Sequence, residues 1–250
     1  MAVIADVFDV VLIDSNNEVI GTTTLTEANI EVTVKENDVR GGKGNQLYGV
    51  LHSDRDVALN LTDIKFRYEW MAKQLGQNIV TGAGVAYAMP KWYEVEAVSS
   101  EKQITLDNIP SDPASVAIYD AAGKKLELTT DFTIAGAVVK LVDVAIAAGD
   151  SVEVRTYKYA TDPKTESIEI DNAVFAKGVK AILETIEIDE ATEDPTHTLQ
   201  YQFYNALPSG NFSVTTASEK TASTQAFNLR VVKPAKSTTV GKVLRIPYSN

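Results

Sequence analysis

The chain has 250 residues, of which 44% are hydrophobic and 23% charged, and its formal net charge is −11. These values are ordinary for a folded protein of one or two domains, so they exclude a disordered chain, and no apolar run is long enough to predict a membrane span. The absence of cysteine excludes disulfides, thiolate metal sites and cysteine nucleophiles, and it fits a reducing cytoplasm.

Acidic and basic residues are distributed unevenly along the chain. Residues 161–200 hold ten acidic and three basic residues, whereas residues 201–250 hold one acidic and six basic residues. The acidic total disfavours nucleic-acid binding, which requires several Lys or Arg contacts with phosphates. The two oppositely charged segments predict either neutralisation within one fold or head-to-tail pairing between identical neighbours.

The first sixty residues predict antiparallel strands. Residues 3–14 are rich in Val and Ile, and the turn-forming residues 15–18 separate them from an extended stretch at 19–21, which predicts a hairpin. Apolar and polar residues alternate over 30–35 and again over 57–61, as in half-buried strands. The glycine-containing loop 39–45 lies between them, and its spacing does not match a phosphate-binding loop.

A single helix is predicted from about Leu61 to Gly76. Thr62 or Asp63 would cap its N-terminus, and Gly76 would take the left-handed conformation that ends it. The apolar residues at helical spacing would pack on a sheet; they are Ile64, Tyr68, Met71 and Leu75, with Phe66 and Trp70 beside them.

From residue 98 onward the pattern changes to short strands with closely spaced turns. The predicted segments are 103–106, 116–119, 126–128, 132–134, 138–141 and 152–159, and this spacing is typical of a small β-sandwich. We therefore interpret residues 98–160 as an inserted Ig-like module. The chain then returns to longer predicted strands at 168–170, 179–188, 199–204, 212–214, 226–232 and 240–246.

The sequence holds no recognisable catalytic or metal-binding constellation. The two histidines, His52 and His197, match no triad or metal-ligand spacing. The acidic run 184–194 lacks the residue order of a calcium loop, so a solvated or lumen-facing acidic edge is the better interpretation. We predict no enzyme activity, no metal and no cofactor.

One region of the sequence resembles a known family. A Val-Arg-Gly-Gly loop at 39–42, followed by a strand at 56–63 that leads into a helix with Trp70, Met71 and Gly76, is similar to bacteriophage major tail tube proteins. The resemblance covers residues 1–97 and 161–250, which we assign to a tube-forming domain. Residues 98–160 are similar to the Ig-like insertions of some phage structural proteins.

The resemblance implies a fold and a function. The fold would be mainly β, a tail-tube-like β-sandwich or barrel with one packed α-helix, plus an inserted small Ig-like β-sandwich. The protein would be a structural virion protein without catalytic residues, whose hexameric rings stack into a tail tube that delivers the genome. Assembly in the host bacterial cytoplasm would involve tape-measure, initiator and terminator proteins, and DNA would pass through without specific binding and without a membrane partner.

Two groups of charged residues are candidates for contacts in such a tube. The glycine loop carries Asp38, Arg40 and Lys43, which we predict at an interface between subunits that reaches a neighbouring ring. Four carboxylates would form an acidic lumen or interface that repels DNA phosphates: Glu184, Glu187, Asp189 and Glu190.

A carbohydrate- or cell-surface-binding β-sandwich is the alternative. Trp70, Trp92 and the ten tyrosines would supply aromatic platforms for sugars. Such platforms require exposed rings, and the helical position of Trp70 favours a place in the core. The exposure of Trp92 is therefore the observation that bears on this alternative.

Overall fold

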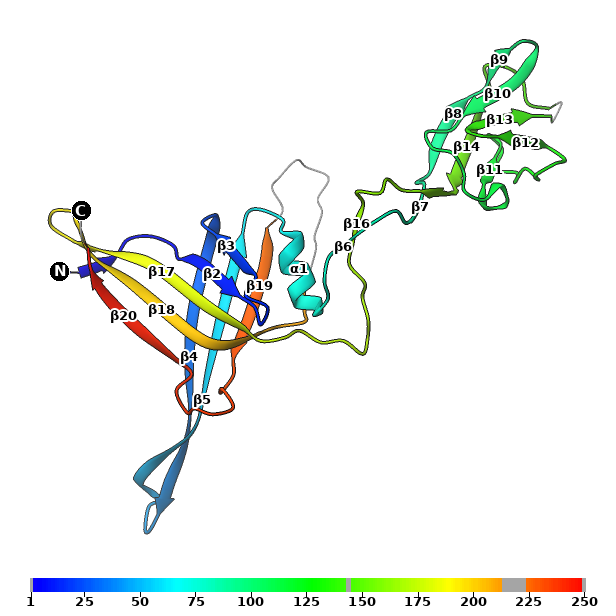
Figure 1. The fold of residues 1–250 in the computed structure, drawn as a ribbon. Coiled ribbons are helices and arrows are strands. Elements are labelled where there is room, and N and C mark those ends of the chain that lie inside the picture. Colours follow the sequence, from blue (N-terminus) through cyan, green and yellow to red (C-terminus); the bar gives the residue numbers. More distant parts are fainter. Residues whose placement is uncertain (1, 143–144, 213–223, 249–250) are drawn as a thin grey trace. The chain divides into compact units, whose positions relative to one another are not determined.

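The computed structural model describes residues 2–142, 145–212 and 224–248, and the chain divides into two compact units (Figure 1). Unit 1 comprises residues 1–79 and 168–250, and unit 2 comprises residues 80–167. The described residues are mainly β with one α-helix, so the predicted fold class is confirmed. The Ig-like assignment of residues 98–160, which lie within unit 2, stays a prediction.

Unit 1 is built on one antiparallel sheet of nine strands. Its main path runs β3-β2-β17-β18-β19-β5-β4, with β1 added on β17 and β20 added on β18. The elements of this unit are β1 (Ala2–Ile4), β2 (Asp9–Ile13), β3 (Val19–Thr22), β4 (Leu25–Gly41), β5 (Gln46–Asp63), α1 (Tyr68–Leu75), β17 (Val179–Asp189), β18 (Pro195–Pro208), β19 (Gln225–Val231) and β20 (Gly241–Pro247).

The sheet divides at β18. Residues 206–208 of this strand pair with β19, whereas residues 197–203 pair with β20, so the two neighbours share one edge of β18 in succession. The end strands of the main path, β3 and β4, do not pair with each other in the described part of the chain. A single subunit therefore holds an open, curled sheet, and of the two predicted architectures the closed barrel is wrong for the isolated chain.

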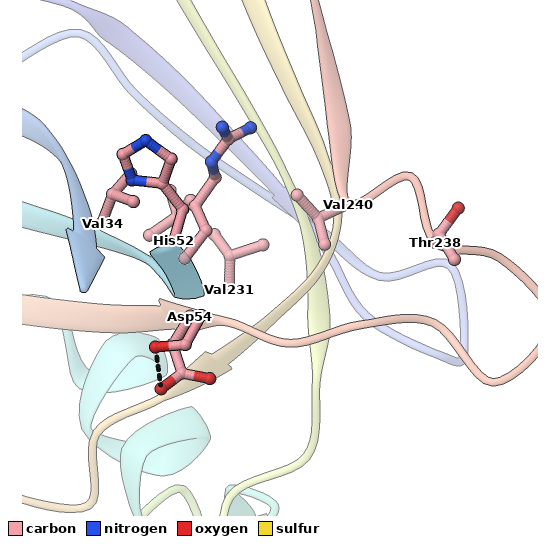
Figure 2. Close-up of a pocket in the computed structure, with 9 residues that line it drawn as sticks. Val34, His52, Asp54, Val231, Thr238 and Val240 are labelled. Carbon is pink, nitrogen blue, oxygen red and sulfur yellow. Dashed lines mark hydrogen bonds between the residues drawn. The ribbon is translucent and has the colours of Figure 1, made fainter. Parts of the chain in front are cut away.

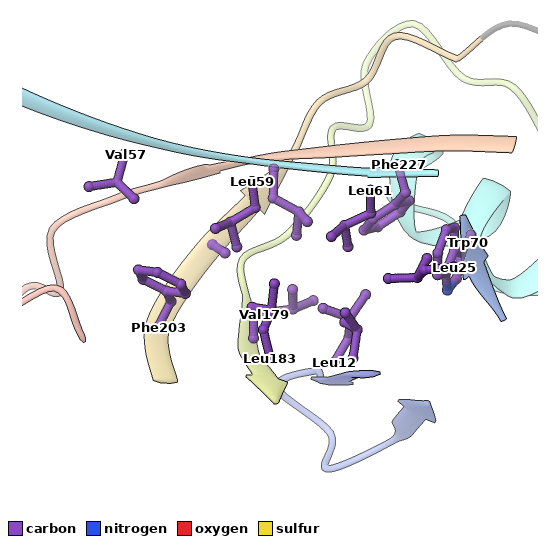
Figure 3. Close-up of a cluster of buried hydrophobic side chains, with 14 residues drawn as sticks. Leu12, Leu25, Val57, Leu59, Leu61, Trp70, Val179, Leu183, Phe203 and Phe227 are labelled. Carbon is purple, nitrogen blue, oxygen red and sulfur yellow. The ribbon is translucent and has the colours of Figure 1, made fainter. Parts of the chain in front are cut away.

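The hydrophobic core of unit 1 lies where the sheet curls over itself. Successive side chains of β17 point to opposite faces of the sheet, and every second residue from Val179 to Glu187 is buried. Figure 3 shows Leu59 and Leu61 of β5 pointing toward Leu12 of β2 and Leu183 of β17. All four side chains are almost fully buried, and burial of each contributes about 1.5–3 kcal/mol.

The single helix is shorter than predicted. Helix α1 begins at Tyr68, because β5 continues through Asp63, so the predicted cap at Thr62 or Asp63 is wrong. The predicted buried face is also wrong at Ile64, which is exposed, whereas Trp70 is fully buried against Phe227.

The predicted end of the helix is confirmed. Gly76 has φ 70°, the left-handed conformation, and its N–H donates to the carbonyls of Ala72 and Lys73. A Cβ at Gly76 would collide with the backbone of Phe175, so glycine is required at this position both by conformation and by packing.

A buried polar network explains why β5 ends at an acidic residue. Asp63 is fully buried, and its carboxylate accepts hydrogen bonds from Thr22 Oγ1 at 2.8 Å and Thr24 Oγ1 at 2.7 Å. The backbone N–H of Lys65 donates at 2.9 Å, and Nε of Arg67 donates at 2.7 Å. Burial alone would raise the pKa of Asp63, but these donors outweigh it and lower the pKa to about 2.

This network predicts a loss of stability in acid. A carboxyl whose pKa falls on folding stabilises the native state above its unfolded pKa, near 3.9, and this contribution of about 2 kcal/mol disappears as the pH falls toward 2. We expect Asp63→Asn to lower the free energy of unfolding of unit 1 at pH 6. At pH 3 the free energies of the variant and the wild type should lie closer together. Urea unfolding, followed by Trp70 fluorescence in a Trp92→Phe background, measures this. A difference in the free energy of unfolding that does not change with pH would contradict the role of the ionised Asp63 carboxylate.

Unit 2 contains two small sheets around its own core, in the orders β12-β13-β10-β9 and β11-β14-β8. Both sheets contribute to that core, with Phe132 and Val139 from the first and Ile118 and Val152 from the second. The elements are β6 (Val80–Thr81), β7 (Val85–Tyr87), β8 (Lys91–Glu94), β9 (Glu96–Val98), β10 (Glu101–Thr105), the 3₁₀ helix η1 (Pro113–Ser115), β11 (Ala117–Tyr119), β12 (Phe132–Ala135), β13 (Val138–Leu141), β14 (Ser151–Thr156), β15 (Lys158–Ala160) and β16 (Glu166–Ser167).

Several predicted strands differ from the structure. Residues 168–170 and 126–128 form no continuous strand, and the stretch predicted at 152–159 divides between β14 and β15. Most of the strand predicted at 212–214 lies outside the described residues. No helix in the described ranges is long and apolar enough to cross a membrane.

Candidate assembly surfaces

Strands β4 and β5 form a hairpin that extends far beyond the rest of unit 1 (Figure 1). The neighbouring strand β19 pairs with β5 only between residues 58 and 63, so residues 32–57 form a two-stranded arm. At about 3.3 Å per residue, each side of this arm is about 30 Å long. We call residues 32–57 the arm.

The arm exposes an unusual amount of apolar surface. An isolated two-stranded hairpin is at best marginally stable, and contiguous exposed apolar residues mark interaction surfaces. Leu51 is 62% exposed and Leu47 is 50% exposed. The exposed large hydrophobic residues of the arm are Val32, Val34, Val39, Leu47, Tyr48, Val50 and Leu51.

The tip of the arm is a tight turn, shorter than the predicted loop 39–45. Residues 39–41 belong to β4, and the turn spans residues 42–45, where Gly42 and Gly44 take positive φ values of 69° and 87°. Arg40 forms an ion pair of 2.7 Å with Asp38 on the same strand, and Lys43 lies in the turn. The structure therefore places all three predicted interface residues at the end of the arm.

A groove lies at the base of the arm (Figure 2). It has a volume of about 380 Å³, and β5, the end of β19 and the segment before β20 form its walls. Figure 2 shows Val34 beside His52 and Val231 near Asp54, so apolar and polar side chains are interspersed along its lining. The groove gives the arm a second surface that a neighbouring chain can contact.

Strand β20 presents a free edge. In an antiparallel pair, the residues that exchange hydrogen bonds alternate with residues whose backbone groups point away. The N–H of Tyr204 donates to Val240 O, and the N–H of Tyr248 donates to Thr196 O, so the even-numbered residues of β20 bond to β18. The backbone groups of Val243 therefore point outward, and within the described ranges β20 pairs with no strand other than β18.

Strand β1 presents a second free edge in the described part of the chain, at the opposite end of the strand order β20-β18-β17-β1. The N–H of Ala5 donates to the carbonyl of Ile186, so by the same alternation the backbone groups of Ile4 point away from β17. Ile4 is 51% exposed, and Val243 is 58% exposed. The segment β20-β18-β17-β1 therefore ends on both sides in exposed, apolar edge strands.

Glu184 lies on the face of β17 opposite the core. Its register partners on either side are Asp9 of β2 and Gln200 of β18, and Nε2 of Gln200 donates to its carboxylate at 2.7 Å. Two carboxylates and an amide therefore form one polar row across three strands. Lys180, Ile182 and Ile186 lie on the same face as Glu184, so this surface is mixed, with apolar residues and a cation beside the carboxylates.

Glu187 lies on the core side of β17, opposite the face of Glu184. Arg245 of β20 donates two hydrogen bonds to its carboxylate, and His197 Nδ1 lies 3.6 Å away. The hydrogen bonds from Arg245 lower the pKa of Glu187, and the carboxylate raises the pKa of Arg245. This side chain is neutralised by a cation of its own subunit.

The remaining two predicted acidic residues lie at the turn between β17 and β18. The Asp189 carboxylate accepts a hydrogen bond of 2.8 Å from the Ala191 N–H, which shapes the turn, and Glu190 is exposed. The structure thus distributes the four predicted carboxylates over two sheet faces and one turn. Of the four, Glu187 lies in the core and is paired with Arg245, whereas Glu184 and Glu190 are exposed.

The described part of the chain offers little for metal binding. No group of three or more His, Asp or Glu residues within the described ranges could hold a metal ion. The surfaces that distinguish the molecule are the apolar arm and the free strand edges, which suit contacts between protein chains.

Comparisons with known proteins agree with this geometry. The model of the YomU/Tube protein family matches residues 2–246, nearly the whole chain. The tail tube protein of Bacillus phage SPR is 25% identical over 205 residues, which cover 80% of this chain and 72% of that protein.

Proposed function

Because this chain belongs to the YomU/Tube protein family of phage tail tube proteins, we propose that its copies join into hexameric rings that stack into a tube for genome delivery. The family resemblance predicted from the sequence is confirmed, and the chain belongs to a structural family rather than an enzyme family. It is a structural protein of the virion tail that assembles with itself and with other tail proteins.

The free edges of β20 and β1 support lateral assembly. An exposed strand edge is a template for pairing with another chain, and soluble proteins normally protect such edges. In the proposed ring, β20 of one copy pairs with β1 of the next, so that the four strands β20-β18-β17-β1 of each copy form one continuous barrel. The number six comes from the family resemblance.

The arm supports axial assembly. The arm is long, so Arg40, Lys43 and its exposed apolar residues lie far from the core of their own subunit. In the proposed tube, a second ring would contact them there. Its apolar surface would be buried between rings, and the groove at its base would accommodate part of a neighbouring chain. Tape-measure, initiator and terminator proteins would set the length of the tube in the host cytoplasm.

The face of β17 that carries Glu184 is the surface we assign to the lumen. The opposite face of this strand is covered by the core, so merged sheets would direct Asp9, Glu184 and Gln200 toward the channel. Carboxylates and amides without a cluster of cations bind phosphates poorly, so DNA would pass without adhering.

Electron microscopy of the purified protein tests this proposal most directly. We expect rings or tubes at high protein concentration, or after addition of the tail-initiation proteins that nucleate assembly. Sedimentation velocity across a concentration series would show the corresponding oligomers. A strict monomer in every salt condition, with no rings in the presence of initiators, would contradict the proposal.

Charge reversal at the tip of the arm should weaken stacking. We expect Arg40→Glu with Lys43→Glu to reduce the yield of tubes at low ionic strength and to leave thermal unfolding of the monomer unchanged. Each exposed ion pair contributes about 0–1 kcal/mol, but a tube repeats the contact at every subunit. Because Arg40 is already paired with Asp38, Lys43→Glu alone should produce most of the effect. Equal tube yields across a salt series would exclude these cations from stacking.

A further inference from the structure

The outer face of the sheet β11-β14-β8 in unit 2 carries an ordered row of side chains. Tyr119, Glu153 and Trp92 are direct neighbours across the three strands, while Ile118 and Val152 point to the opposite side, into the core. Adjacent strands are about 4.8 Å apart, so the Cα atoms of the two aromatic residues are about 10 Å apart.

Trp92 is the open end of this row. Its side chain lies on the solvent side of β8, and the residue is 55% exposed. In the described part of the chain, neither an aromatic ring nor a cation packs on it, whereas the other tryptophan, Trp70, is completely buried. An exposed tryptophan offers a flat apolar surface together with one N–H donor.

The other end of the row is a preorganised polar group. The Arg155 guanidinium lies 3.7 Å from the centre of the Tyr119 ring, and its Nε donates to Glu153 Oε2 at 2.8 Å. The two contacts hold the planar guanidinium over the Tyr119 ring and against Glu153, the cross-strand neighbour of Trp92. The Arg155 side chain is 47% exposed, so further N–H donors of the fork reach solvent. The Glu153 side chain is 20% exposed, so its carboxylate stays accessible as an acceptor.

We propose that this face binds a neutral glycan, with a sugar ring stacked on Trp92 and hydroxyl groups bonded to Arg155 and Glu153. A pyranose ring presents C–H groups on one face and hydroxyls at its rim. The C–H groups pack on the electron-rich face of an aromatic ring, and the hydroxyls bond to fixed donors and acceptors. Trp92 supplies the aromatic face, and Glu153 and Arg155 of the neighbouring strand β14 supply the acceptor and the donors.

The composition of the face argues against other ligands. Glu94 and Glu153 are balanced by Arg155 and by Lys125, the bridge partner of Tyr119, so the face lacks the net positive charge that nucleic-acid phosphates require. The residues that alternate outward with Trp92 include no large aliphatic side chain, whereas a stable protein interface requires an apolar centre of several hundred Å². A single shallow platform binds weakly, with a Kd of about 1 mM.

Weak binding becomes useful through repetition. If the proposed tube forms, every subunit carries one such face, and many simultaneous contacts give a high total affinity for a polysaccharide surface. This consequence rests on the proposed function. The binding face itself does not, because it belongs to one unit of one chain.

Ligand-observed saturation-transfer NMR on the full-length monomer, at concentrations below assembly, tests the site. The probes are maltohexaose, cellohexaose and chitohexaose, each titrated to about 10 mM. We expect saturable binding of at least one probe, an at least tenfold weaker affinity in Trp92→Ala, partial retention in Trp92→Phe, and a weaker affinity in Arg155→Ala. Tyr87→Ala, which removes another exposed aromatic residue of unit 2, is the matched control and should bind as wild type does.

Three results would overturn the proposal. The first is the absence of saturable binding of all three probes, and the second is an equal loss of binding in Tyr87→Ala and Trp92→Ala. The third is a Trp92→Ala variant that weakens self-assembly and leaves sugar signals unchanged, because the face would then be a contact between copies. Unfolding curves of each variant verify that the core of unit 2 is intact.

Discussion

Val243→Pro is expected to leave the subunit folded and to abolish its lateral assembly. The N–H of Val243 points away from β18, so a proline there removes no hydrogen bond of the subunit, and edge strands tolerate proline at such positions. The same substitution removes a donor that a neighbouring strand would use and places the proline ring in its path. We expect the apparent affinity between subunits to fall at least about a hundredfold, which is about 2.7 kcal/mol.

Sedimentation velocity and electron microscopy measure the assembly, and urea unfolding measures the fold. The free energy of unfolding of the Val243→Pro monomer should stay within about 1 kcal/mol of wild type. Val243→Thr keeps the N–H and the β-branched shape, so it should assemble normally. Leu244→Pro removes a donor that bonds to β18 and should destabilise the monomer by about 3 kcal/mol. Normal tubes from Val243→Pro would rule out β20 as the lateral edge.

The long strand β17 was predictable from the sequence. Residues 179–188 were expected as a strand, and β17 spans Val179–Asp189 with alternate residues buried. The same alternation separates Glu184 from Glu187, because residues three apart on a strand lie on opposite faces. The strand prediction therefore already places Glu184 and Glu187 on two different surfaces, and not on one acidic surface.

The network around Asp63 could not be predicted in this way. Its partners Thr22 and Thr24 lie 41 and 39 residues earlier in the chain, and only the curl of the sheet brings them to the end of β5. Local propensity favours a helix cap at an aspartate that precedes a helical pattern. Tertiary hydrogen bonds instead extend the strand to this residue, and the helix begins five residues later.

The free edge of β20 and the exposure of the arm also required the structure. Val32 and Val34 alternate with polar residues as buried strand residues do, yet they are 56% and 37% exposed and lie outside the core of unit 1. A sequence pattern predicts which face of a strand is apolar. It does not distinguish a face covered by its own core from one covered by another subunit, and in a tube-forming protein both kinds occur.

The second large effect is expected from the arm. We expect Leu47→Asp with Leu51→Asp to block the growth of tubes and to leave the monomer stable. Leu51 pairs with Asn37 and Leu47 with Arg40, which places the two leucines on opposite faces of the arm. The double variant therefore adds a charge to whichever face a neighbouring ring covers.

The size of this effect follows from burial. Each leucine contributes about 1.5–3 kcal/mol when it leaves water, and an aspartate in its place would in addition have to lose its hydration. Loss of the leucine contact on the covered face of every subunit, together with the charge that replaces it, should raise the concentration needed for tubes by at least about a hundredfold. Because the leucines are 50% and 62% exposed in the subunit, urea unfolding of the monomer should not change.

A matched control separates the arm from a general effect of added charge. Ile109→Asp with Val142→Asp replaces two residues of unit 2 that are 65% and 55% exposed, and it adds the same two charges. If the arm mediates stacking, this control assembles as wild type does, and the arm variant accumulates as single rings, because the edges of β20 and β1 remain intact. Tubes from both variants would place the axial contact elsewhere, whereas monomers from the arm variant would show that the arm also joins neighbours within one ring.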